Sequence, residues 1–246
     1  MSYLFTAVTH KLTRANYSLN RIGSAAFWFK PTWSQNDNVD HYMGIQLVDG
    51  SNNWLIRKTG APNDMRAGWT TSATSYQVVV ATSGYTLVTN AWNSFVLTWD
   101  DDTNFTRLYL NGAQIGNNNA LLTYQTPATL TWGTFLDTTN LSGSLAEASF
   151  HRTVLSPAQV TLHHQGMVAT GYSQSVINYW PLVNNPNDLV GSADLTVTGA
   201  TVSVDHPPMQ PLFNPALRPQ PRPSLVLGID QPFRHSVRPM RGPRHK

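Results

Sequence analysis

The sequence predicts an all-β fold built from antiparallel strands, and three observations carry this prediction. Apolar and polar residues alternate along short runs such as residues 95–99, and a period of two residues is typical of a half-buried strand. Asp49-Gly50 and Asn111-Gly112 separate such runs and favour hairpins, because both residues of each pair tolerate positive φ. Charged residues make up only 12% of the chain, and Thr, Ser, Asn and Gly serve as the polar residues of strands and turns.

The composition divides the 246 residues into two parts at His206-Pro207-Pro208. Residues 1–205 hold nine Lys and Arg against twelve Asp and Glu, a formal charge of −3. Residues 206–246 hold seven Lys and Arg against one Asp, together with ten prolines. Proline-rich chain is extended and cannot form a core. We therefore expect a β-sandwich over 1–205 and an extended, Pro/Arg-rich C-terminal arm over 206–246.

The first half of the chain reads as strands in close succession. Pro31 ends a core strand, since proline cannot donate to a ladder, and Asp49-Gly50 turns the chain between a hairpin pair. Strands are expected within 1–15, at 17–19, 24–30, 41–48, 53–58, 65–69, 76–81 and 85–89.

The stretch 92–116 predicts a meander of three strands, with an acidic turn at Asp100–Asp102 and a tight turn at Asn111-Gly112. Later strands are expected at 129–135, 144–151, 176–182 and 193–204.

One short helix is expected after Leu155. Ser156 is a good N-cap, Pro157 suits the first helical position, and Gln159 completes a capping box. Gly166 is a natural residue to end the helix.

Four of these stretches carry a resemblance to a known family. Residues 92–112, 24–31, 143–150 and 155–160 resemble, in order and spacing, the strands and short helix of laminin G-like, concanavalin A-like domains. The match runs over roughly residues 16–166. It implies an antiparallel jelly-roll β-sandwich. Because this fold hosts lectins, hydrolases, receptor modules and viral structural domains, the resemblance implies no single activity.

An enzyme is not expected. The glucanase relatives use a Glu-x-Asp-x-x-Glu pattern, and retaining hydrolysis needs two carboxylates about 5–5.5 Å apart. This chain has one glutamate, Glu147, whose neighbours two positions away are Leu145 and Ser149. We expect Glu147 to pair with Arg152 on a sheet face or at its rim.

No cofactor is expected, with calcium as the alternative. Asp37 and Asp40 lie in one polar loop, and Ca²⁺ takes oxygen ligands of this kind. A solvated turn is the favoured interpretation of that loop. The chain has no cysteine, and His163-His164 point about 100° apart on a helix, so zinc is not expected. The histidines are expected at the surface.

Tryptophans near loops suggest a carbohydrate site as an alternative function. Lectins stack an aromatic ring under the apolar face of a sugar. Trp33, Trp54 and Trp69 are the candidates, although packing in the core and at its rim explains most tryptophans of a sandwich.

The arm is expected to bind a partner. Its arginines are interleaved with proline rather than clustered, which favours an acidic protein surface over nucleic acid. The apolar patch 225–229 can add strand pairing. The partner-binding residues are expected to be Phe213, Leu217, Arg218, Arg222, Leu225, Val226, Leu227, Ile229, Phe233, Arg234, Arg238 and Arg241.

The leading hypothesis for function is a non-enzymatic virion structural protein. The body resembles laminin G-like domains of bacteriophage structural proteins. It has no cysteine, and we expect neither a secretion signal nor a membrane span from its sequence. This resemblance implies a capsid decoration protein on the capsid surface, assembled in the host cytoplasm. Its expected partner is the major capsid protein or another virion protein, with a homo-oligomer left open. The alternative is a lectin-like module for host-surface glycan.

Overall fold

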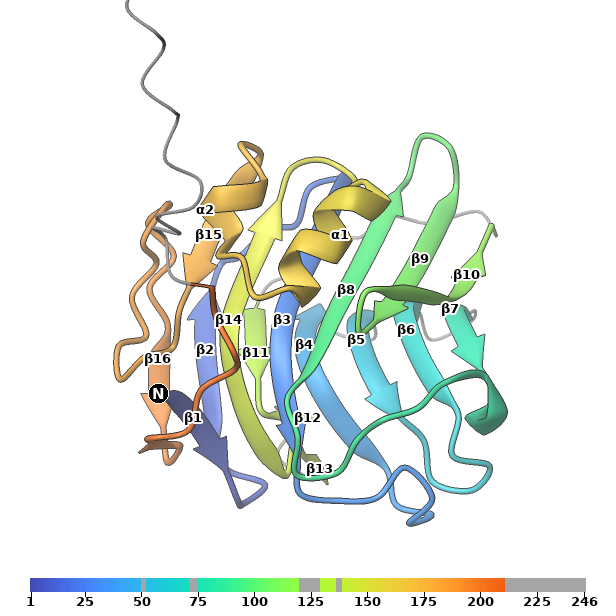
Figure 1. Ribbon diagram of the computed structural model, residues 1–246, viewed down its shortest axis with the longest axis horizontal. Helices are drawn as coiled ribbons and strands as arrows, with labels where there is room; N and C mark the ends of the chain where they lie inside the picture. The colour runs from blue at the N-terminus through green and yellow to red at the C-terminus, as the bar shows by residue number, and fades with distance from the viewer. Residues whose placement is uncertain (50–51, 71–74, 120–128, 136–138, 211–246) are drawn as a thin grey trace, which may run out of the picture. The chain divides into compact units, whose positions relative to one another are not determined.

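Two antiparallel sheets face each other across one apolar core (Figure 1). The computed structural model describes residues 1–49, 52–70, 75–119, 129–135 and 139–210. The predicted all-β sandwich is confirmed.

The first sheet has the order β10-β9-β8-β3-β14-β1-β17, and β15 also pairs with β14. All of its pairings are antiparallel. Its strands are β1 (Ser2–Phe5), β3 (Ile22–Pro31), β8 (Asn93–Asp100), β9 (Phe105–Leu110), β10 (Ala113–Asn118), β14 (Gly143–His151), β15 (Val176–Trp180) and β17 (Thr201–Ser203).

The second sheet has the order β16-β2-β11-β4-β5-β6-β7, and β12 and β13 form a separate short hairpin. The strands of this sheet and hairpin are β2 (Lys11–Ala15), β4 (His41–Asp49), β5 (Asn52–Lys58), β6 (Met65–Thr70), β7 (Ser75–Val80), β11 (Thr129–Trp132), β12 (Thr134–Phe135), β13 (Thr139–Asn140) and β16 (Thr196–Thr198).

The predicted meander is confirmed as β8, β9 and β10. Its acidic turn is local: the Asp100 carboxylate accepts hydrogen bonds from the backbone N–H groups of Asp102 and Thr103, at 2.9 and 3.1 Å. Asn111 and Gly112 both have positive φ, as a tight hairpin turn requires.

Three strand predictions are corrected. Residues 17–19 form no strand, but Tyr17 and Leu19 are buried, so their apolar character serves packing. Residues 85–89 follow the 3₁₀ turn η1 (Thr82–Gly84) as irregular chain. The single strand expected over 193–204 is instead two short strands, β16 and β17, joined by a turn at Gly199, where φ is +68°. The first pairs with β2 and the second with β1, so together they join the edges of both sheets.

The core is rich in stacked and edge-on aromatic rings. Phe27 stacks on Phe95 with 5.3 Å between ring centroids, and Trp54 meets Trp99 edge-on at 5.1 Å. Each of these four side chains is at most 1% exposed. Aromatic side chains of this size dominate the free energy gained by burial.

Two helices lie over the first sheet (Figure 1). The predicted capping box is confirmed in α1 (Pro157–His164), where Ser156 and Gln159 exchange hydrogen bonds. A second short helix, α2 (Ala169–Tyr172), has no counterpart among the predictions. Under the helices lies a second apolar cluster that includes Ala26, Val96 and Tyr109. Among the described residues, neither helix has the length and hydropathy to cross a membrane.

The predicted arm falls largely outside the described residues, which end at Gln210. All twelve partner-binding residues named above lie beyond that point, so their role and the division at residue 205 stay predictions. Residues 205–210 are described, and they contact the body through pairs such as His206 with Glu147.

Candidate functional site

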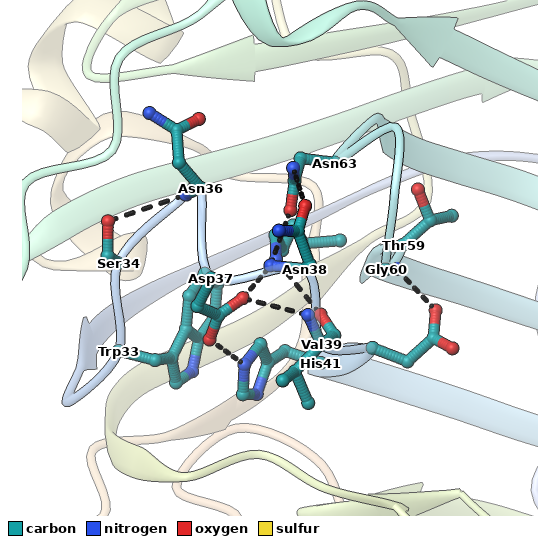
Figure 2. Close-up of polar contacts among 12 residues, drawn as sticks. Trp33, Ser34, Asn36, Asp37, Asn38, Val39, His41, Thr59, Gly60 and Asn63 are labelled. Carbon is teal, nitrogen blue, oxygen red and sulfur yellow. Dashed lines mark hydrogen bonds and ion pairs between the residues drawn. The ribbon is translucent and has the colours of Figure 1, made fainter.

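Two loops meet at the end of β3. The loop between β3 and β4 carries Asn38, and the loop between β5 and β6 carries Asn63, each with positive φ. The Asn63 side chain accepts a hydrogen bond from the Asn38 backbone N–H at 3.0 Å and donates one to the Asn38 side chain at 2.8 Å (Figure 2). Asparagine tolerates this left-handed backbone, so the pair holds the two loops together.

A buried ion pair lies beneath these loops. The Lys58 side chain has no exposed surface, and its ammonium donates to the Asp37 carboxylate and to the Val39 carbonyl, the latter at 2.9 Å. The other Asp37 oxygen lies 2.7 Å from Nε2 of His41 (Figure 2). Burial opposes ionisation of Asp37, but the hydrogen bonds from Lys58 and His41 outweigh it and hold the Asp37 pKa below its usual value.

Trp33 packs within this cluster. Its ring stacks on His41 with centroids 4.1 Å apart, and the Lys58 ammonium lies 5.8 Å from the ring centroid. The indole N–H donates to the Leu141 carbonyl at 3.1 Å. With 7% of its surface exposed, Trp33 offers no open face to a sugar.

The loop between β3 and β4 is therefore held by ion pairs and hydrogen bonds, and it is not the solvated turn that the sequence predicted. Asp37 is held by Lys58 and His41, and Asp40 accepts from the Gly60 N–H at 2.9 Å. Over the described ranges, no group of three or more His, Cys, Asp or Glu residues is arranged to hold a metal ion. Calcium binding by Asp37 and Asp40 stays a prediction that this geometry does not support.

The other two tryptophan candidates are also core residues, which corrects their assignment as sugar platforms. Trp54 is fully buried and Trp69 is 2% exposed. Both lie on paired strands of the second sheet and belong to the main apolar cluster. Stacking on a ligand requires an exposed ring face, and these rings have none.

The sequence predicted that Glu147 pairs with Arg152, and this prediction is wrong. It occupies a bulge in β14, has a φ of +55° and is 5% exposed. Its carboxylate accepts a hydrogen bond from the Tyr179 hydroxyl and lies 2.9 Å from Nε2 of His206. A bulge redirects the side chains of its strand, which explains why Glu147 is buried with Tyr179 and His206 as partners.

Two histidines expected at the surface are buried where α1 and α2 cover the first sheet. His151 is 1% and His163 2% exposed. His151 lies 3.1 Å from the Ser149 hydroxyl, and His163 donates to the Phe27 carbonyl at 3.3 Å. Burial lowers the pKa of His151 to about 3 and that of His163 to about 4. Both are therefore neutral near pH 7.

An open hollow of about 560 Å³ lies at the opposite end of β3, where that strand begins. Arg21 is oriented by Asp101 at 2.8 Å and Asp102 at 3.1 Å. Arg152 is exposed. The lining residues are Asn20, Arg21, Ile22, Asp102, Arg152 and Ile177. No local motif marks this hollow, because its residues come from distant parts of the chain.

A family model described as the concanavalin A-like lectin/glucanases superfamily matches residues 6–161. The chain belongs to this superfamily. No curated protein sequence shows a significant match.

Solved structures share the fold at low sequence identity. A heptameric SAP-like pentraxin from Limulus polyphemus superposes with a TM-score of 0.58 at 14% identity, over 83% of this chain and 95% of the pentraxin. A protein of Bacteroides ovatus described as a candidate carbohydrate-binding protein gives 0.60 at 13%, over 83% of this chain and 61% of its own length. Domain 4 of an extracellular arabinanase from Geobacillus stearothermophilus, in complex with arabinotriose, gives 0.51 at 15%, over 64% and 73%.

Proposed function

We propose that this chain is a non-catalytic carbohydrate-binding module whose site is the hollow at the start of β3. The observation that carries the proposal is the lining of the hollow, which combines planar polar side chains with two isoleucines in one open depression. Membership of a superfamily that includes lectins supports it. So do the descriptions of the Bacteroides protein and of the arabinotriose complex.

The chemistry of the lining suits a sugar. Asn20, Asp102 and Arg152 offer donors and acceptors that can meet vicinal hydroxyl groups. Ile22 and Ile177 offer apolar surface to the C–H face of a ring. The ion pairs from Arg21 to Asp101 and Asp102 hold part of the site in place before a ligand arrives. A site that is already ordered loses less entropy on binding.

The non-catalytic part of the proposal rests on the carboxylates. Glycoside hydrolysis requires an acid and a second carboxylate across the scissile bond. The only glutamate of the chain is 5% exposed, and its carboxylate is held by Tyr179 and His206. Glu147 is therefore not available to a substrate in this conformation.

A glycan array with the intact protein tests the proposal. We expect a specific hit whose affinity falls at least tenfold in Arg152→Ala, because a charged hydrogen bond is worth about 1.5–3 kcal/mol. Arg14→Ala, on β2 of the other sheet, is the matched control and should bind as wild type. Absence of any hit, or equal loss in both variants, would refute the site.

A second candidate function concerns the Pro/Arg-rich segment. We propose that it anchors the protein to an acidic surface of a capsid or other virion protein, which would make the chain a virion structural protein assembled in the host cytoplasm. The composition of residues 206–246 supports this, with its ten prolines and +6 formal charge. Attachment of residues 205–210 to the body gives the segment a defined origin. Virus particles that retain a chain lacking residues 211–246 at full occupancy would contradict it.

A further inference from the structure

Residues 205–210, called the stem here, leave β17 and attach to the body at separate points. The first is Asp205. One carboxylate oxygen lies 2.5 Å from the Lys30 ammonium, and the other accepts from the Trp92 indole N–H at 3.2 Å. This contact joins the stem to β3 and to the segment that precedes β8.

The second attachment uses the glycine that ends α1. The Gln210 backbone N–H donates to the Gly166 carbonyl at 2.8 Å, and Pro207 is buried between the two ends of the stem. A Cβ atom at Gly166 would lie 2.2 Å from the Pro208 carbonyl oxygen. Only glycine lets the stem approach this closely, so the fit between stem and body is specific.

The third attachment depends on a proton. His206 places Nε2 2.9 Å from the Glu147 carboxylate and Nδ1 2.9 Å from the Pro207 carbonyl. Both partners are acceptors when Glu147 is ionised, whereas a neutral imidazole has a single N–H. Satisfying both contacts therefore needs one additional proton, carried by the imidazole or by the carboxyl group.

The other ionisable groups around this pair keep one state near neutral pH. Burial and the nearby Glu147 charge raise the pKa of Tyr179, and burial raises that of Tyr172 on α2, so both stay protonated. Burial opposes ionisation of Asp205, but hydrogen bonds from Lys30 and Trp92 outweigh it and lower its pKa. The Lys30 ammonium pairs with Asp205. The contact between His206 and Glu147 is thus the part of the attachment that we expect to depend on pH.

We propose that the stem is a proton-dependent latch, docked on the body while Glu147 and His206 share one proton and released when rising pH removes it. Loss of the proton leaves neutral His206 with one N–H for two acceptors, and leaves the buried Glu147 carboxylate without a counter-charge. An uncompensated buried charge is costly. The latch is independent of the carbohydrate proposal.

The absence of cysteine allows a direct test on the full-length protein, because Gln210→Cys provides a single labelling site. The Gln210 side chain is exposed, and a nitroxide there reports stem mobility by electron paramagnetic resonance. We expect restricted motion at pH 6 and a growing mobile component towards pH 9, with the docked-to-released ratio falling by up to tenfold per pH unit over this range.

Three variants in the labelled background make the test specific. Glu147→Gln keeps a hydrogen-bonding side chain but removes the charge, so the pH dependence should disappear, as it should in His206→Gln. His245→Gln removes a different histidine and should titrate as wild type. A label equally restricted at pH 6 and pH 9, one mobile throughout, or a pH dependence that survives in both pair variants would each overturn the latch.

Discussion

Lys58 determines what the loop at the end of β3 can bind. Its ammonium has no exposed surface and neutralises Asp37, the carboxylate that a cation would otherwise need. Replacing Lys58 by Met would leave the Asp37 carboxylate with His41 and the Val39 backbone N–H as partners, without the full counter-charge of Lys58. We expect the free energy of unfolding to fall by roughly 3 kcal/mol, as when one partner of a buried ion pair is removed. Urea denaturation at pH 7 measures this.

The matched control removes both charges. In the double variant Lys58→Met, Asp37→Asn, no carboxylate is left without a counter-charge, so the loss should be clearly smaller than in the single variant. If the free energy of unfolding of Lys58→Met lies within about 1 kcal/mol of the wild-type value, the ion pair contributes little to stability.

Helices α1 and α2 cover two histidines that fold in the neutral state. Their folded pKa values, about 3 for His151 and about 4 for His163, lie below the unfolded value of about 6.5. The stability that the folded protein gains from keeping these two histidines neutral is therefore fully present above pH 6.5. It is lost as the pH falls towards their folded pKa values. Between pH 6.5 and 5, each buried histidine should lower the free energy of unfolding by up to about 2 kcal/mol.

Chemical denaturation at pH 7, 6 and 5 measures this dependence. His163→Gln should reduce the slope between pH 6.5 and 5, and His10→Gln, in the turn between β1 and β2, should leave it unchanged. Equal slopes in wild type and His163→Gln would contradict the assignment.

The end of α1 and the stem depend on each other through Gly166. Its φ is +86°, and an added Cβ would collide with the Pro208 carbonyl oxygen. Gly166→Ala should therefore cost about 1–2 kcal/mol and release the stem at every pH in the nitroxide experiment. Gly171→Ala, inside α2, meets only the Met167 side chain within 3.4 Å and should keep the stem docked. A docked stem in Gly166→Ala would show that the close contact is not needed.

Within the part of the chain that the structure describes, the members of the main core run from Tyr3 to Leu195. Removing residues 211–246 should therefore change Tm by less than about 2 °C, while it removes seven positive charges and one negative charge. Thermal unfolding followed by circular dichroism tests the first expectation. A large fall in Tm would mean that the segment contributes to folding.

Local sequence patterns were sufficient to predict much of the fold. The meander at 92–116 and the helix after Ser156 depend on residues close in sequence, namely alternation, Asn111-Gly112 and a capping box. Local rules act over a few residues, so their outcome can be read directly. The predicted sandwich class, the Asn111-Gly112 turn and most of the strands were confirmed for this reason, whereas the Asp49-Gly50 turn falls partly outside the described residues.

Only the tertiary structure decided which charged and polar side chains contact one another. Lys58 meets Asp37 across 21 residues, Glu147 meets His206 across 59, and Arg21 meets Asp101 across 80. Strand order and the bulge at Glu147 create these contacts. A bulge changes which face a side chain occupies, and pairing between distant strands leaves no local signal. The sequence by itself determined a concanavalin A-like sandwich with a basic, proline-rich end, whereas only the folded chain determined which charges are buried, which are shared and where a hollow remains open.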